Sequence, residues 1–207
     1  DLIMPLSHWV IDTTLRQLRE WQDLGIDTKV AANISARNLQ DNDLPNKIAV
    51  LLEQHQIAPH HLELEITESA MIVDPLRALE TLCRIHELGV VLAIDDFGTG
   101  YTSLSHLRKL PISTLKIDFS FISHMLKSKD DAALVQSIIY LGHNLGMGVI
   151  AEGVENQATL DMLDVFKCDV AQGFFICPPM PAHEITPWLH TQVLSSTPPR
   201  ATEIIAC

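Results

Sequence analysis

The 207-residue sequence is poor in basic side chains, and this shortage excludes one class of partner. Lysine and arginine together number 14, against 26 aspartate and glutamate residues, so the formal net charge is −12. Binding to duplex nucleic acid needs a basic face, so we expect no duplex partner. A small anionic ligand remains compatible with this charge if a divalent metal ion supplies the positive charge.

Cysteine and long apolar runs are also scarce. Four cysteines occur without a CxxC pair or a nearby CxxH, so they predict reduced, mostly buried thiols of a cytoplasmic protein, with no disulfide framework and no zinc site. The longest apolar run, residues 89–94, has the length of a strand and is far below the roughly 18 residues of a membrane-spanning helix. Residues 1–3 lack the basic start of a secretory signal, so we expect none.

The composition that remains is that of a folded globular protein, with 47% hydrophobic and 19% charged residues. A chain of this length favours one domain with a large core. We expect this domain to cover residues 1–194, and residues 195–207, which contain Ser-Ser-Thr-Pro-Pro, to form a disordered tail or linker.

Two periodicities alternate along the chain. Short β-rich runs predict strands at residues 30–35, 62–67, 90–97, 114–118, 148–154 and 170–175. Apolar residues three or four positions apart predict helices around residues 6–24, 44–52, 76–88, 104–107, 134–145, 160–166 and 185–193. For the third of these helices, Asp74 is a candidate cap, Pro75 suits the first position and Gly89 the left-handed stop.

Strands separated by single helices predict an α/β fold with a parallel sheet. Six strands fit two architectures, an open doubly wound sheet or a (β/α)₈ barrel whose first two strands would precede Asp1. The pattern of strands and helices does not decide between these two architectures.

Every predicted strand carries a polar residue near its carboxyl end, where both architectures place their sites. The residues are Asn33, Glu65, Asp95, Asp96, Lys116, Glu152 and Gln172. A single carboxylate of this kind is more often a helix cap or an ion-pair partner, but a whole set predicts a site. Converging carboxylates repel one another without a cation between them, and oxygen ligands favour Mg²⁺ or Mn²⁺ over zinc. Lys116 either snorkels to the surface from an edge strand or pairs with these carboxylates.

Six motifs resemble, in order, those of the EAL-domain family of bacterial cyclic di-GMP phosphodiesterases. They lie at residues 33–37, 63–69, 95–101, 115–118, 151–155 and 172–174, and the resemblance extends from residue 2 to about 181. It implies a modified TIM-type (β/α)₈ barrel, with six strands in this chain and the first two missing. It also implies hydrolysis of cyclic di-GMP to linear pGpG in second-messenger signalling.

The resemblance also implies roles for individual residues. Two Mg²⁺ or Mn²⁺ ions would be held by Asn33, Glu65, Asp95, Asp96 and Glu152, and the catalytic residues would be Glu152, Lys116 and Gln172. Substrate would be bound by Asn33, Ser35, Arg37 and Gln172. Glu68 would anchor the loop at residues 97–103, although capping of the following helical turn is an alternative for this residue. The expected partners are a second copy of the domain and an upstream sensor or GGDEF domain.

The chain departs from the family pattern in two ways. It contains no Glu-Ala-Leu signature, whose glutamate is a metal ligand in the family, so we expect the 207 residues alone to be poorly stable and inactive. Phe119 and Pro178 stand where a basic residue is common. The alternative function is a catalytically inactive cyclic di-GMP receptor or interaction module.

Overall fold

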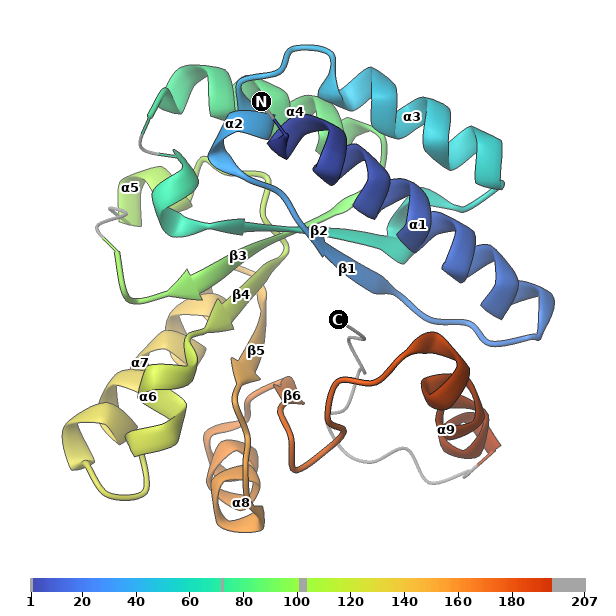
Figure 1. Cartoon of the computed structure of the whole chain (residues 1–207). Helices are drawn as coiled ribbons and strands as arrows, with labels where there is room; N and C mark the ends of the chain where they lie inside the picture. The colour runs from blue at the N-terminus through green and yellow to red at the C-terminus, as the bar shows by residue number, and fades with distance from the viewer. Residues whose placement is uncertain (1, 72, 101–103, 195–207) are drawn as a thin grey trace.

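The computed structural model describes residues 2–71, 73–100 and 104–194. One parallel sheet runs through this part of the chain, as Figure 1 shows, and its strands are β1 (Val30–Asn33), β2 (Leu62–Thr67), β3 (Val91–Phe97), β4 (Thr114–Ile117), β5 (Gly148–Glu152) and β6 (Val170–Gln172). The helices are α1 (Ile3–Asp23), α2 (Ala36–Leu39), α3 (Leu44–His55), α4 (Pro75–Glu87), α5 (Leu104–Leu107), α6 (Phe119–His124), α7 (Lys129–Asn144), α8 (Gln157–Phe166) and α9 (Ala182–Leu194). Two 3₁₀ turns, Pro59–His61 and Glu68–Met71, flank β2.

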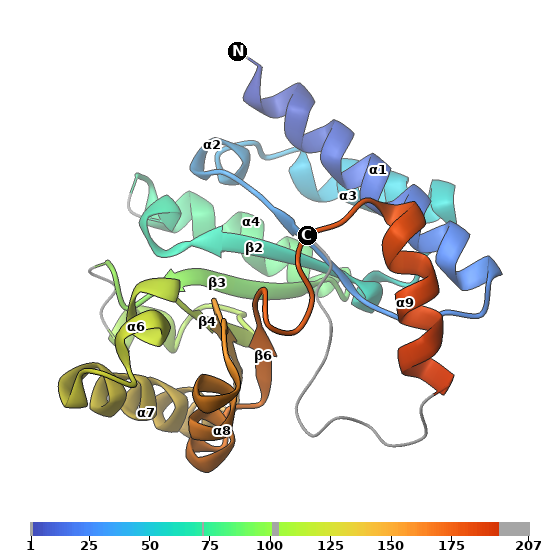
Figure 2. The same ribbon diagram turned by 60° about the horizontal axis from the view of Figure 1, so that its bottom comes forward.

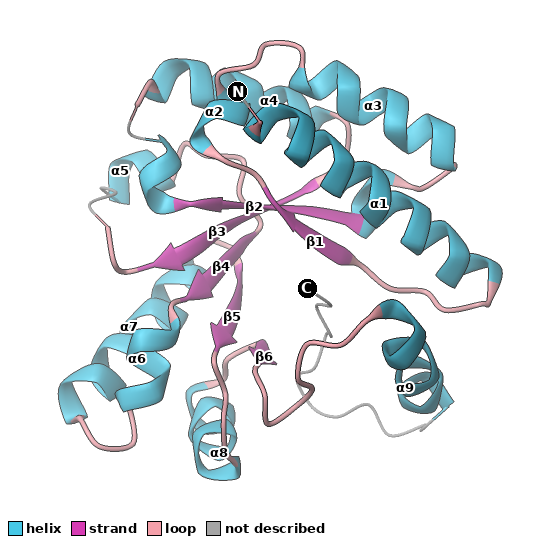
Figure 3. Ribbon diagram, in the orientation of Figure 1, coloured by secondary structure: helices cyan, strands magenta, loops and turns pink. Residues whose placement is uncertain are grey.

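The order of the strands distinguishes between the two architectures that fit the sequence. Each strand pairs in parallel with the next one along the chain, in the order β1-β2-β3-β4-β5-β6. A doubly wound sheet reverses this order at a switch point, whereas a barrel keeps it. The sheet curves, with the large helices outside the curve (Figure 3), so the described chain is a half-barrel of the (β/α) type and the predicted fold class is confirmed.

All six predicted strands are present, but four end earlier than the sequence suggested. β1 stops at Asn33 because Ser35 caps a short helix, α2, which the apolar pattern did not reveal. β6 stops at Gln172, since the amide of Phe175 turns back to donate to the carbonyl of Val154. Helix α6 was also missed, and Asp118, expected at the end of β4, instead caps this helix.

The boundaries of α4 are those that the sequence predicted. Asp74 Oδ1 accepts a hydrogen bond from the amide of Arg77 at 3.2 Å, and Pro75 is the first helical residue. Gly89 follows the helix with φ +93°, a conformation that favours glycine.

The last helix lies beside the first one. Figure 2 shows α9 next to α1, and the indole Nε1 of Trp21 donates a hydrogen bond to Thr186 Oγ1 at 2.9 Å. Ile185 and Leu189 of α9 are buried in the same core as Trp21. The two ends of the described chain are thus joined across the open side of the sheet.

Two further expectations concern cysteines and membrane spans. Cys83, Cys168 and Cys177 are free thiols, and Cys207 lies outside the described residues. Of the three described cysteines only Cys168 is buried, so the expectation of mostly buried thiols is wrong for this part of the chain. Among the described residues, the helices are all too short or too polar to cross a membrane. The tail predicted at residues 195–207 lies outside the described residues.

Candidate active site

Lys116 of β4 lies at the centre of an acidic cluster at the carboxyl ends of the strands. Its Nζ atom is 2.5 Å from Glu65 Oε1, 2.6 Å from Glu152 Oε1 and 3.3 Å from Asp95 Oδ1. The residue is only 3% exposed, so the alternative of a snorkelling surface lysine is wrong. Strands β2, β3 and β5 therefore each direct a carboxylate at one buried ammonium group.

A β-bulge brings two consecutive aspartates into this cluster. Ile94 pairs with Leu115 and Phe97 with Ile117, so three steps along β3 match only two along β4. Asp96 occupies the extra position with φ +54°, which is rare for a residue other than glycine. Neighbouring side chains of a regular strand point to opposite faces, but the bulge lets Asp95 and Asp96 serve the same site.

The bulge completes a group of carboxylates that fits a cation. One oxygen atom from each of Asp95, Asp96 and Glu152 lies within 4.8 Å of the other two. All three are hard oxygen donors, and this donor set suits Mg²⁺ or Mn²⁺. These three residues are among the predicted metal ligands. Glu65, a fourth predicted ligand, contacts Lys116, the same lysine that contacts Asp95 and Glu152.

Burial and mutual repulsion set the proton affinities of these carboxylates. Burial raises the pKa of Glu65 and of Glu152, and the nearby Lys116 opposes this rise only in part. The pKa of Asp96 is raised by burial and by the charges of Asp95 and Asp118. Burial alone would lower the pKa of Lys116, but its three carboxylate neighbours outweigh burial and raise it, so the side chain is an ammonium ion. The cluster thus contains one ammonium group and four carboxyl groups, those of Glu65, Asp95, Asp96 and Glu152. A bound cation would offset the excess of negative charge.

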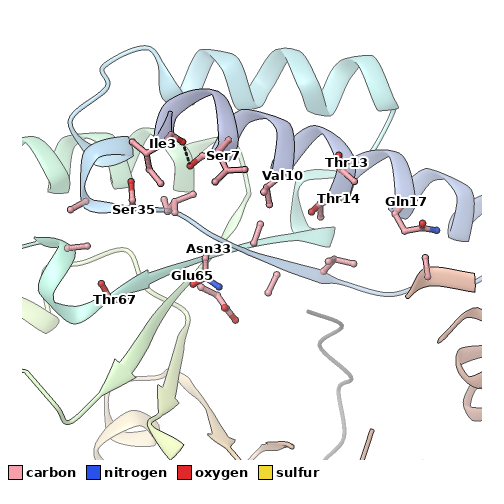
Figure 4. Close-up of a pocket in the computed structure, with 18 of the residues that line it drawn as sticks. Ile3, Ser7, Val10, Thr13, Thr14, Gln17, Asn33, Ser35, Glu65 and Thr67 are labelled. Atoms are coloured by element: carbon pink, nitrogen blue, oxygen red, sulfur yellow. Dashed lines mark hydrogen bonds between the residues drawn. The ribbon is translucent and has the colours of Figure 1, made fainter. Parts of the chain in front are cut away.

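Asn33 lies next to Glu65 but is exposed. The two residues are register partners at the ends of β1 and β2, and their side chains point to the same side of the sheet in Figure 4. Both line a groove of about 830 Å³ between α1, β1 and the start of α9. This position is compatible with the predicted ligand role, although Asn33 is not among the three carboxylates that approach one another.

Three other candidates differ in their distance from the acidic cluster. Gln172 is the register partner of Glu152 at the end of β6, beside the cluster. Ser35 lines the groove, but its hydroxyl caps α2 and lies 2.6 Å from Asn38 Oδ1. Arg37 is exposed on α2. The fold thus groups Gln172 with the carboxylates and leaves Ser35 and Arg37 on the neighbouring α2 segment.

Glu68 is buried below the loop that follows β3. Its Oε2 atom accepts a hydrogen bond from the amide of Gly100 at 3.1 Å. A side chain at residue 100 would collide with it, because a Cβ atom there would lie 2.7 Å from Glu68 Cδ. This contact agrees in position with the predicted anchoring role. The other end of the loop, residues 101–103, lies outside the described residues.

We expect Glu68→Ala to accelerate hydrogen exchange at the Gly100 amide by about 10- to 100-fold, since a hydrogen bond to a charged group contributes about 1.5–3 kcal/mol. Exchange measured by NMR tests this. The amide of Thr99, which donates to the carbonyl of Asp96, is the internal control and keeps its rate. Glu68→Gln retains an acceptor oxygen and restores most of the protection. Unchanged exchange at Gly100 in Glu68→Ala contradicts the anchoring role.

Asp118 lies near the acidic cluster, although no role was predicted for it. Its charge raises the pKa of Asp96, so the two carboxylates are close. Asp118 directly follows the end of β4, two positions after Lys116, at the edge of the sheet where the cluster lies. A carboxylate at the end of a parallel strand is the signal that would have identified it.

A half-barrel of parallel strands whose carboxyl ends carry an acidic cluster around one lysine defines a (β/α)-barrel protein with a candidate cation site. The family model for the EAL domain matches residues 1–179 of the chain. The chain belongs to the EAL domain family.

Curated relatives and solved structures agree with this assignment. The chain is 41% identical to the bifunctional diguanylate cyclase/cyclic di-GMP phosphodiesterase MucR of Pseudomonas aeruginosa, over 89% of the chain and 27% of MucR. It is 38% identical to the cyclic di-GMP phosphodiesterase NbdA of the same organism, over 96% of the chain and 25% of NbdA. The chain therefore spans about a quarter of the length of these relatives.

Two solved structures have the same fold. A MucR phosphodiesterase in complex with c-di-GMP is 41% identical, with a TM-score of 0.85, over 89% of this chain and 75% of that one. The EAL domain of Mycobacterium smegmatis DcpA is 33% identical, with a TM-score of 0.85, over 90% of this chain and 84% of that one. Both neighbours extend beyond the part that this chain matches.

Proposed function

We propose that the protein containing this chain hydrolyses cyclic di-GMP to linear pGpG with the help of two divalent cations, Mg²⁺ or Mn²⁺. The observation that carries the proposal is the approach of Asp95, Asp96 and Glu152 to within 4.8 Å beside the buried Lys116. Relatives named as cyclic di-GMP phosphodiesterases, at 38–41% identity, support the choice of substrate.

The residues of the chain divide the chemical work as follows. Asn33, Glu65, Asp95, Asp96 and Glu152 would hold the cations, which when bound lower the pKa of water and neutralise charge on phosphate oxygens. The ammonium group of Lys116 offsets negative charge that develops on the substrate. Glu152, whose pKa is raised by burial, accepts a proton at its carboxylate more readily than an exposed glutamate does. Gln172 beside Glu152 positions water or substrate.

We expect the whole protein to cleave cyclic di-GMP in Mg²⁺ or Mn²⁺ and to lose this activity in chelator. Chromatographic detection of pGpG measures the reaction, and restored cleavage after metal is added back excludes damage by the chelator. Cleavage that continues unchanged without metal overturns the proposal. Binding of cyclic di-GMP by calorimetry with no turnover in either metal points instead to an inactive receptor.

The remaining expectations on partners and location are part of the same proposal. The domain pairs with a second copy and receives its input from an upstream sensor or GGDEF domain. MucR is named as a diguanylate cyclase as well as a phosphodiesterase, and this supports an upstream cyclase domain. A cytoplasmic location agrees with the three free cysteines among the described residues.

A further inference from the structure

An aromatic ring borders the acidic cluster where β4 and β5 end. Phe119 is the first residue of α6, three positions after Lys116, and Gly153 directly follows Glu152. A Cβ atom at Gly153 would lie 2.1 Å from Phe119 Cδ2, so the ring rests directly on the backbone of Gly153. The ring therefore lies beside the residue that follows Glu152, and its own residue comes three positions after Lys116, so we place it at the edge of the cluster.

One part of this ring packs against the backbone although much of the residue is exposed. Gly153 adopts φ +75°, a conformation that side chains disfavour, and any side chain there would also displace the ring. One part of the ring is thus held against the backbone, while 47% of the residue remains exposed. An apolar surface held in this way beside charged groups is suited to contact a flat, apolar part of a ligand.

The substrate of the proposed function has such a part. Each phosphodiester of a cyclic dinucleotide is one ribose away from a purine base, so a phosphate bound at the carboxylate cluster carries a base toward the rim. Phe119 has no charge for a phosphate, but its ring can stack on a base. Stacking of this kind tolerates different bases, because every base has a π-face.

We propose that Phe119 is a substrate-binding residue that stacks on one base of the cyclic dinucleotide. The inference rests on the proposed function and extends it to the recognition of the base. Removal of a stacking aromatic weakens binding of a base by about 5- to 150-fold, and Phe119 is expected to act mainly on the binding of substrate and not on the chemical step.

Steady-state kinetics of the whole protein with cyclic di-GMP in Mn²⁺ test this proposal through four variants. Phe119→Ala and Phe119→Leu both remove the ring, but leucine still covers Gly153. Phe119→Tyr keeps the ring. Tyr140→Ala is the matched control, because Tyr140 is 71% exposed on α7, away from the cluster.

We expect Phe119→Ala and Phe119→Leu to raise KM at least fivefold with kcat within about twofold, whereas Phe119→Tyr and Tyr140→Ala retain the wild-type KM. A normal KM in Phe119→Leu overturns the proposal, because the side chain then only covers Gly153. An active wild type with a normal KM in Phe119→Ala overturns this inference alone. A wild type that neither binds nor cleaves cyclic di-GMP overturns the proposed function, and the inference with it.

Discussion

Glu152→Ala is expected to lower kcat for cyclic di-GMP by about 10³-fold or more in the whole protein, which is in the range seen when a positioned acid–base or charge-stabilising group is removed. The carboxylate does two things in the structure. It lies within 4.8 Å of Asp95 and Asp96, and it contacts Lys116 at 2.6 Å. Its removal takes one ligand from the candidate cation site and one counter-charge from the lysine.

A second readout separates these effects from misfolding. Calorimetry with Mn²⁺ alone should show weaker metal binding in Glu152→Ala, while the melting temperature stays near that of the wild type. Glu80→Ala, which removes an exposed glutamate on the outer helix α4, is the matched control and should retain both activity and metal binding. If Glu152→Ala retained the wild-type kcat, the proposed catalytic role of Glu152 would be wrong.

Lys116→Met should destabilise the protein by about 3–5 kcal/mol, the usual result of removing one partner from a buried ion pair. Methionine fills a similar volume, so little packing is lost. The large effect arises because Glu65, Asp95 and Glu152 then face one another without a cation. Urea unfolding of the whole protein in chelator measures the loss.

The pH dependence of this loss has a defined sign. Burial already raises the pKa of Glu65 and Glu152 above their ordinary value of 4.5, and the loss of Lys116 raises both further. Above pH 4.5 the folded state then binds more protons than the unfolded state, so stability falls as pH rises. The deficit of Lys116→Met should therefore be smaller at pH 5 than at pH 8.

An exposed lysine provides the comparison. Lys47 pairs with Asp41 at 2.8 Å on the surface, and exposed pairs contribute about 0–1 kcal/mol. Lys47→Met should cost no more than this, with little change between pH 5 and 8. If Lys116→Met and Lys47→Met lowered the free energy of unfolding equally, the conclusion that Lys116 balances the charge of buried carboxylates would be wrong.

The sequence predicted the sheet and the residues of the cluster well, because both follow from local patterns. Apolar runs located all six strands, and polar residues at their ends identified Glu65, Asp95 and Glu152 before any geometry was known. Parallel strands bring their carboxyl ends to one edge, so convergence followed from the fold class. The motif resemblance then selected the barrel, which periodicity alone had left open.

The geometry of the cluster could not be predicted in the same way. The bulge at Asp96 depends on how β3 registers with β4, and adjacent aspartates by themselves imply opposite faces. The choice for Lys116 between the surface and the cluster depends on its burial, which depends on neighbours from three other strands. Helix α2 was missed because its start depends on the side-chain cap of Ser35 and not on an apolar period.

The hydrogen bond between Trp21 and Thr186 has a consequence for the order of assembly. In a sheet whose neighbours are consecutive, each βα unit can dock as soon as the previous one has formed. The contact between α9 and α1 is different, since it joins residues 165 positions apart and closes a long loop. During synthesis, α1 must therefore wait for the last helix to emerge before this contact can form.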